Sequence, residues 1–412
     1  MKFVSKFTMA AVLALGGPAL VTAVPAIAQK KGEAAQPELQ LSKAERDALA
    51  PLQTAFDTAN YPAALQAANA ARNVVTGPDA KHFLAQYLYQ IGVKSNDYKV
   101  QAEGLELLAA SPKTPQADIA TLQSQIGVIA FNYLRDYPMA ERAMTRKIEL
   151  TPNDAEALSN LGRVKRELKK PQEALPLFRR AIQAQTAAGQ KAPEAWHKLA
   201  LDIAYTAKSP EAMAISRDWV AAYPTAANWR DALLIYRELA KPDNDTSIDA
   251  YRLARASKAL AGERDYILYA DAVDKKGLPA EAKAVLDEGF ATRVLDSSKA
   301  DLKSFQTAAG RRASEDRASI NAEATKALSG TGTSALKIGD ALLGHGDYAK
   351  AADLYRAAIQ KGGVDANVAN TRLGIALAMA GRKPEAETAF KAITGPRSEL
   401  ANYWLVWLAQ RA

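Results

Sequence analysis

Apolar and small side chains recur along this chain every three or four residues, which is the spacing of one face of an α-helix. The clearest example lies between Tyr137 and Pro224, where two groups of such residues follow each other. Pro171 stands between the groups, at a position that suits the first turn of a helix because its missing N–H costs little there. The pattern predicts two helices joined by a short turn. Their facing residues are Leu158, Leu161, Gly162, Ala174, Phe178 and Ala181.

The same arrangement of small and apolar residues recurs along the chain at a near-constant interval. Ala140 precedes Ala174 by 34 residues, and Ala174 precedes Ala212 by 38. Near the C-terminus Ala351 precedes Ala386 by 35 residues. One helix pair cannot bury its apolar face alone, so neighbouring pairs must stack. We therefore expect about eight to ten helix pairs along most of the chain.

This combination of residues resembles the tetratricopeptide repeat (TPR) family. The family pattern puts Trp, Leu and Gly on a first helix, and Ala, Phe, Ala and Pro on and after a second. The resemblance implies an all-α, right-handed α-solenoid of stacked antiparallel helix pairs. No period-two alternation of β-branched residues competes with this fold class. The residues that carry the resemblance are Leu161, Gly162, Ala174, Phe178, Ala181, Trp196, Leu199, Ala200, Ala212 and Pro224.

The N-terminus has the features of a secretory signal peptide. Lys2 and Lys6 precede an apolar run that ends in Ala26-Ile27-Ala28, an A-x-A cleavage site. We expect cleavage after Ala28 and a periplasmic protein; the alternative is an N-terminal membrane anchor. Residues 29–40 are polar and contain a proline, which predicts a disordered tether.

The remaining chain divides into three predicted parts. Residues 41–330 carry degenerate and clean TPR-like helix pairs, and residues 331–397 carry two further units. Residues 297–332 are poor in large apolar side chains, which predicts either an eroded helix pair, in which the repeat pattern is degenerate, or a joint between two stacks of helix pairs. We place a domain boundary near Gly330. The polar residues 241–247 predict a turn with a helix N-cap.

The last segment, residues 398–412, predicts a terminal helix with apolar residues around most of its circumference. Solenoids need such a cap, usually with a polar outer face. A capping helix is one interpretation. The alternative is an association surface, through which the chain forms a homodimer. The residues that would form it are Tyr403, Trp404 and Trp407.

Composition narrows the function classes. The 412 residues include no cysteine, which excludes disulfides and thiolate metal sites, and carry a formal net charge of +8 that is spread along the chain. A nucleic-acid groove would need clustered basic and aromatic residues, so we expect no nucleic-acid partner. Beyond the N-terminal run, no stretch has the length and apolarity of a membrane span.

Motifs for catalysis are missing. Neither H-E-x-x-H, G-x-S-x-G nor a Walker loop occurs. The S-x-x-K match at Ser334–Lys337 lies on a predicted first helix and has no K-T-G partner. His82, His197 and His345 are far apart in sequence, and we expect them on the surface or in turns. We predict no catalytic site, no cofactor and no metal.

The TPR resemblance implies a binding groove, since the first helices of this family line a concave face. The family's clamp for a C-terminal carboxylate uses a Lys/Asn/Asn/Lys/Arg set. Only Asn160 falls on one of these positions, and Ile129 stands where an Asn is expected, so the specificity stays open. The groove residues implied for this chain are Ser159, Asn160, Arg163, Arg166 and Lys198.

The functional prediction is a non-enzymatic scaffold of the bacterial cell envelope that binds a protein or peptide partner. The alternative is a periplasmic enzyme, or an enzyme subunit, that acts on cell-wall or exported polysaccharide. Such an enzyme would need a pair of carboxylates in the groove. The candidates for that pair are Glu167, Asp202 and Asp340.

Overall fold

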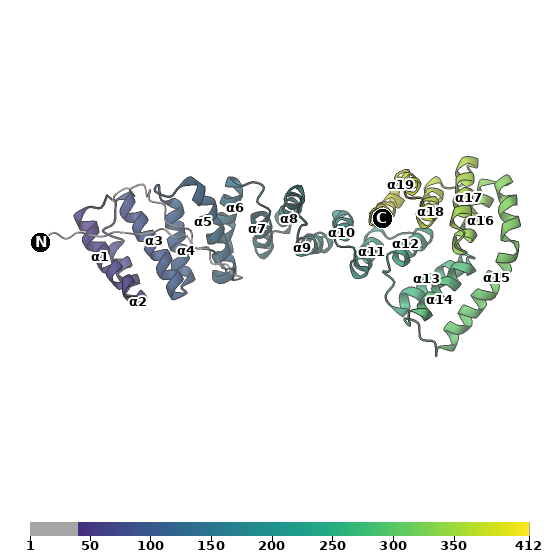
Figure 1. Cartoon of the computed structure of the whole chain (residues 1–412), viewed down its shortest axis with the longest axis horizontal. Coiled ribbons are helices and arrows are strands. Elements are labelled where there is room, and N and C mark those ends of the chain that lie inside the picture. The colour runs from purple at the N-terminus through teal and green to yellow at the C-terminus, as the bar shows by residue number, and fades with distance from the viewer. Residues whose placement is uncertain (1–39, 412) are drawn as a thin grey trace, which may run out of the picture.

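The computed structural model describes residues 40–411 as an all-helical chain, with no strand in this range (Figure 1). The predicted all-α solenoid of helix pairs is confirmed. The signal-peptide prediction and almost all of the tether prediction concern residues outside the described range.

The helices of the first half are α1 (Lys43–Asp57), α2 (Tyr61–Ala71), α3 (Pro78–Ser95), α4 (Tyr98–Ala110), α5 (Gln116–Ile129), η1 (Ala130–Leu134), α6 (Tyr137–Leu150), α7 (Ala155–Glu167), α8 (Pro171–Ala187) and α9 (Glu194–Thr206). Those of the second half are α10 (Glu211–Ala222), α11 (Ala226–Ala240), α12 (Asn244–Ala256), α13 (Glu263–Lys275), α14 (Pro279–Ala291), α15 (Ala300–Ser329), α16 (Gly332–Gly344), α17 (Tyr348–Lys361), α18 (Ala366–Met379), α19 (Lys383–Lys391), η2 (Gly395–Arg397) and α20 (Ser398–Ala409).

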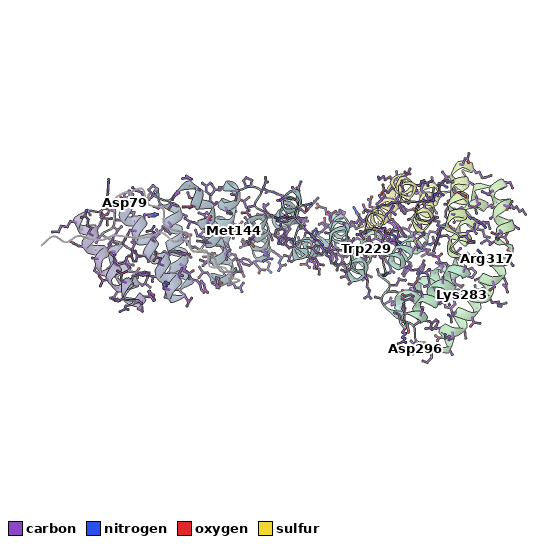
Figure 2. All side chains as sticks on the ribbon, in the orientation of Figure 1. Asp79, Met144, Trp229, Lys283, Asp296 and Arg317 are labelled. Atoms are coloured by element: carbon purple, nitrogen blue, oxygen red, sulfur yellow. The ribbon has the colours of Figure 1, made fainter. Side chains whose placement is uncertain are left out.

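The first half is an elongated stack of hairpins. Its helices pair in order as α1 with α2, α3 with α4, and so on, and each pair packs on the next; the last pair joins α9 to α10, the first helix of the second half (Figure 1). The stack is one helix pair wide, so it exposes two long faces. Met144 lies within this stack, and Trp229 lies where it meets the second half (Figure 2).

In the helix pairs that match the repeat pattern well, a glycine on the first helix determines how closely the second helix packs against it. A Cβ atom on Gly162 would lie 3.0 Å from the ring of Phe178, which is fully buried. Gly374 has the same relation to Phe390, with a Cβ distance of 2.6 Å. Because no larger side chain fits without displacing the ring, these glycines fix the helix separation.

Helix α15 departs from the prediction for residues 297–332. Ala300–Ser329 is one continuous helix, so the eroded-pair interpretation is wrong. Its buried side carries small residues with a few larger ones, and it packs against α14 and α16. Gly330 lies between α15 and α16, and Ile320 and Ala335 on either side of it share one hydrophobic cluster.

The second half closes on itself. Helix α20 packs against α10 and α12, so the end of the chain returns to the start of this half (Figure 1). The hydroxyls of Tyr403 and Ser216 are 2.5 Å apart, and Gln410 donates to the Val220 carbonyl at 2.8 Å. Contacts between residues about 190 apart in sequence therefore hold the closure.

This closure corrects the association-surface interpretation of the terminal helix. Tyr403 and Trp404 are fully buried and Trp407 is 4% exposed, all within their own chain. Burial also raises the pKa of Tyr403 to about 12, so its hydroxyl stays protonated at neutral pH. Side chains that are already covered cannot form a homodimer interface without unfolding the closure.

Candidate functional site

The predicted groove residues lie on α7 and α9, and two of them share a structural feature. Ser159 is 1% exposed, and Arg163 lies one turn further along α7 and is half-buried. Neither the Ser159 hydroxyl oxygen nor Arg163 Nε has a hydrogen-bond partner in residues 40–411. Asn160 is half-buried between them. These two polar atoms therefore have unused hydrogen-bonding capacity, and each is covered by the protein itself.

The other two predicted residues are exposed cations with local partners. Lys198 Nζ lies 3.1 Å from Glu194 one turn earlier on α9. Arg166 lies 3.8 Å from its neighbour Glu167. Exposed ion pairs of this kind contribute about 0–1 kcal/mol, so a ligand can exchange them at little cost.

Sequence reasoning missed two further residues that, like Ser159 and Arg163, carry buried polar atoms without a partner in residues 40–411; we call these four residues the row. Gln125 Oε1 on α5 and His197 Nδ1 on α9 also lack a partner within the described part of the chain. Gln125 precedes Asn160 by 35 residues, and His197 follows Ser159 by 38, which are repeat intervals. The repeat spacing itself could have found them. Three successive first helices, α5, α7 and α9, thus carry buried polar atoms without an internal partner.

The expectation that His197 lies on the surface or in a turn is wrong. The side chain is 3% exposed, and its ring packs edge-on to Tyr223 with centroids 6.0 Å apart. Burial lowers the pKa of His197 below its usual value, so the ring is neutral at pH 7. A neutral imidazole has one donor and one acceptor nitrogen, and can therefore bind either kind of group.

A network of ion pairs holds α7 in its place in the stack. Lys165 Nζ lies 2.5 Å from Glu141 on α6 and also pairs with Glu173 on α8. The hydrogen bond from Lys165 lowers the pKa of Glu141 below its usual value. One lysine therefore ties three consecutive helices together, which makes the face of α7 a preformed surface.

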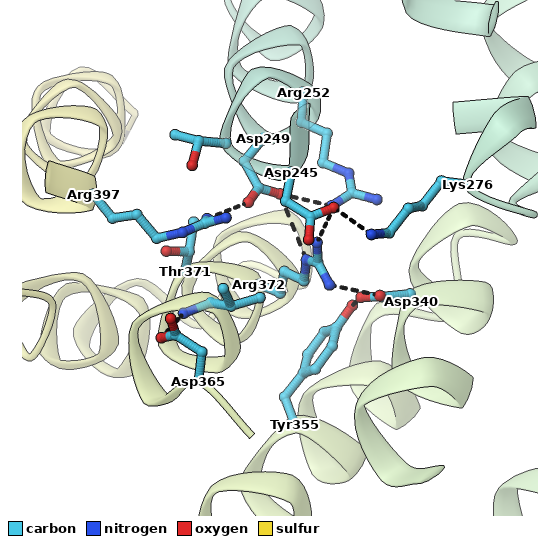
Figure 3. A network of polar contacts seen from close by, with 12 residues as sticks. Asp245, Asp249, Arg252, Lys276, Asp340, Tyr355, Asp365, Thr371, Arg372 and Arg397 are labelled. Carbon is cyan, nitrogen blue, oxygen red and sulfur yellow. Dashed lines mark hydrogen bonds and ion pairs between the residues drawn. The ribbon is translucent and has the colours of Figure 1, made fainter. Parts of the chain in front are cut away.

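The three carboxylates of the enzyme alternative lie in different surroundings. Asp340 on α16 is buried, and it accepts hydrogen bonds from Arg372 at 2.7 Å and from the Tyr355 hydroxyl at 2.8 Å (Figure 3). Glu167 is half-buried on α7, and Asp202 is exposed on α9. Asp340 therefore serves a structural network, and no carboxylate pair is formed with it in a groove.

That network occupies the interior of the second half (Figure 3). Asp249 on α12 accepts hydrogen bonds from Arg252 and from Arg397, each at 2.8 Å. Arg252 also donates two hydrogen bonds to Glu281 on α14, at 2.8 and 2.6 Å. Arg372 on α18 lies 3.8 Å from Asp249 and joins it to the Asp340 pair. Buried charges are tolerated only when paired in this way.

The pKa directions agree with a charged network. Burial alone would raise the pKa of Glu281, but the charge of Arg252 lowers it below its usual value. Burial would lower the pKa of Arg252, but Glu281 and Asp249 hold it well above the usual value. Burial does raise the pKa of Asp340, against the opposing effect of Arg372. Each charge in the network is therefore tolerated in the interior because its partners are present, and loss of one member leaves a buried charge uncompensated.

Within residues 40–411, no group of three or more His, Asp or Glu side chains is arranged to hold a metal ion. A search of the same residues finds no helix with both the length and the apolarity needed to cross a membrane.

Comparison with known proteins identifies the repeat. The family model described as tetratricopeptide repeat matches residues 128–193 and 336–401. Both matched segments are tetratricopeptide repeats. The first match runs from the end of α5 to the turn before α9, and the second runs from α16 into α20.

Solved structures give only distant similarity to this chain. A tetratricopeptide repeat protein from Parabacteroides merdae is 14% identical, with 82% of this chain and 100% of that chain covered and a TM-score of 0.26. The APC/C hetero-tetramer Cut9-Hcn1 is 13% identical, with 87% and 66% covered and a TM-score of 0.21. Scores this low support no argument about function. No curated protein sequence matches the chain.

The tetratricopeptide repeat fold suggests a scaffold for protein–protein interaction. A stack of helix pairs offers a long, preformed surface instead of a single cleft. The row of unpartnered polar atoms on α5, α7 and α9 lies in and beside the first matched segment.

Proposed function

We propose that this protein is an exported, non-enzymatic scaffold of the bacterial cell envelope that binds a peptide segment or protein partner along α5, α7 and α9. One observation carries the proposal. Buried polar atoms without an internal partner recur on these three successive first helices. A buried polar group that lacks a hydrogen bond costs about 1–3 kcal/mol, so a ligand that supplies the bond gains affinity.

The chemistry of these atoms suits a polypeptide. Arg163 Nε is a donor, Gln125 Oε1 is an acceptor, and the Ser159 hydroxyl can be either. An extended peptide backbone presents donors and acceptors in alternation, so it can satisfy both kinds of group. The exposed cations Arg166 and Lys198 add a preference for acidic side chains along the same segment.

The preformed surface makes such binding favourable even when each contact is weak. Association must overcome lost translational and side-chain freedom, and a rigid surface reduces this cost. The ion pairs of Lys165 to both neighbouring helices supply that rigidity for α7. The partner itself is expected to become ordered on the groove.

Export is the second part of the proposal, and it is supported by the N-terminal sequence. The apolar run and the A-x-A motif ending at Ala28 are typical of a secretory signal peptide. Mass spectrometry of the protein purified from cells should find Gln29 at the N-terminus. Retention of Met1 would contradict export with cleavage.

The partner can be identified by in-cell crosslinking followed by mass spectrometry. Wild type should give a reproducible protein partner, and Arg163→Glu should lose it because a donor cation becomes an anion. Arg180→Glu is the matched control, since Arg180 is exposed on α8 outside the row, and it should retain the partner. Turnover of glycan by the purified protein, with no partner recovered, would refute the scaffold.

A further inference from the structure

The second half contains a pocket of about 400 Å³ that the proposed groove does not use. It lies inside the closure formed by α20, where α12 and α14 face α18 and the turn between α16 and α17. A pocket of this volume is in the range that holds small organic ligands.

The pocket has an apolar wall that runs from solvent to the interior. Met379 on α18 is 38% exposed, which places it at the mouth, and Ile375 lies one turn earlier on the same helix. Leu343 and the fully buried Trp404 complete the wall. Methionine adapts its shape to different ligands, so its position at the mouth suits a site that admits an apolar body.

The carboxylates of Glu281 and Glu288 also line the pocket, where they accept hydrogen bonds from Arg252 and Arg255, so the buried polar atoms left without a partner within the described range are two ring nitrogens. The Trp404 side chain is fully buried, and its indole nitrogen finds no acceptor in residues 40–411. Arg255 donates through Nε to Glu288 at 2.7 Å and through Nη2 to the Ala284 carbonyl at 3.4 Å. Its Nη1 donors are bonded to no residue of the described range. His345 Nε2, in the turn, is likewise unpartnered there.

Arg255 remains a cation in this setting. Burial would lower its pKa, but the hydrogen bond to Glu288 raises it above the usual value. Guanidinium groups bind carboxylates through paired N–H donors, with a strength about twice that of neutral hydrogen bonds. Glu288 already pairs with the Nε side of Arg255, so the pocket attracts acceptor oxygens through the remaining Nη1 donors and the unsatisfied indole N–H, beside an apolar wall.

We propose that this pocket binds a small carboxylate with an apolar body. The carboxylate lies against Arg255 and the Trp404 N–H, and the apolar body lies along Ile375, Leu343 and Met379. The site is independent of the peptide groove, since it lies in the other half of the chain and shares no residue with it.

Saturation-transfer difference NMR on the full chain tests the proposal with two probes of the same apolar body, N-acetylleucine and N-acetylleucinamide. Wild type should transfer saturation to the leucine methyl groups of the carboxylate in a saturable manner, and at least fivefold less to those of the amide. Equal transfer to both probes would overturn the carboxylate assignment, and no transfer to either would overturn the site.

Two variants locate the binding, and one serves as a control. Arg255→Met keeps the volume of the side chain but removes its charge, and should reduce transfer at least fivefold. Met379→Trp should block the mouth and give the same loss. Arg311→Met is the control, because Arg311 is 74% exposed on α15 and lies outside the pocket. Circular dichroism confirms that each variant is folded, and transfer unchanged by both pocket variants would contradict the proposal.

Discussion

Arg397 Nη1 donates a hydrogen bond to Asp249 Oδ2 at 2.8 Å, although 148 residues separate the two in sequence. Asp249 is fully buried, and the Arg397 side chain is 9% exposed. Asp249 lies on α12, and Arg397 immediately precedes α20, so this ion pair joins an early helix of the closed half to its last helix (Figure 3). The closure thus depends on charge pairing as well as on the apolar contacts of α20.

Replacement of Asp249 by asparagine should destabilise the second half severely. The substitution removes the charge that Arg252 and Arg397 both contact, and leaves those cations buried without full compensation. Breaking a buried ion pair by removing one partner costs about 3–5 kcal/mol. Chemical denaturation monitored by circular dichroism measures the loss.

The control for this prediction is Asp353→Asn. Asp353 pairs with Arg356 on the surface of α17, with a side chain that is 64% exposed. Exposed pairs contribute about 0–1 kcal/mol, so this variant should unfold close to wild type. Equal effects of the two substitutions would show that the network is not a stabilising feature.

Removal of residues 398–412 should unfold the second half and should not convert a dimer into a monomer. The truncation uncovers Trp229 and Tyr236, which are buried beside Tyr403 in the intact chain. Sedimentation velocity and near-ultraviolet circular dichroism should show lost tertiary structure or aggregation. A stable, soluble monomer obtained from a dimeric full-length chain would contradict the account.

Gly162 should not tolerate a larger side chain. A Cβ atom there meets the fully buried Phe178 ring at 3.0 to 3.2 Å, and Gly162→Leu adds three further carbon atoms. Overpacking of this kind costs about 1–3 kcal/mol. Thermal unfolding measures the change, and an unchanged melting temperature would show that this contact does not set the helix separation.

Gly310→Ala should stabilise the protein, in contrast to the substitution at Gly162. Gly310 lies within α15, and a Cβ there meets only the flexible end of Lys283, at 3.3 Å. Alanine favours the helix over glycine by about 1 kcal/mol, so this variant should be slightly more stable. A loss of stability in Gly310→Ala would mean that the space beside α15 is tighter than the contact with Lys283 indicates.

Much of the repeat could be predicted from local pattern. The spacing of Gly162 and Phe178 identified two facing helices because both residues act within one helix pair. The second matched segment was found in the same way, from Gly374 and Phe390. Such features are readable because the residues that decide them lie within about one repeat of each other.

The closure of the second half could not be predicted in this way. Asp249 and Arg397 each look like an ordinary surface residue in sequence, and only the fold brings them together. The apolar circumference of α20 was correctly noted, but its cause lies in α10 and α12, far upstream. Helix α15 was missed because the shortage of large apolar side chains in residues 297–332 was interpreted as an eroded pair or a joint, although small residues also form the buried side of a helix.

The groove was predicted in part. Ser159 and Arg163 were assigned from the family pattern, and both carry atoms without an internal partner. Gln125 and His197 lie at repeat intervals from Asn160 and Ser159, so their positions were readable from the sequence, but their burial and their lack of a hydrogen-bond partner were not. Arg166 and Lys198 have ion-pair partners of their own, which the pattern could not indicate.

Acid should weaken the N-terminal end of the stack through Glu45. Hydrogen bonds from the backbone N–H groups of Gly77, Ser42 and Thr76 lower the pKa of Glu45 to about 2. The folded pKa lies below the usual glutamate value of 4.5, so the contribution of Glu45 to stability is present above pH 4.5 and is lost as the pH falls towards 2.

The measurement is the difference in melting temperature between wild type and Glu45→Gln as a function of pH. Wild type should exceed the variant at pH 7, and the difference should shrink between pH 4.5 and 2. A difference that does not change with pH would show that the carboxylate charge is not what joins the start of α1 to the start of α3.

The central claim is that a partner lies along the first helices α5, α7 and α9, and site-specific photo-crosslinking in cells tests it most directly. A photoreactive amino acid is placed in turn at Asn160, at Lys198 and, as a control on α8, at Arg180. The account predicts the same protein adduct from positions 160 and 198 and none from position 180. Adducts of equal yield from all three positions, or from position 180 alone, would contradict it.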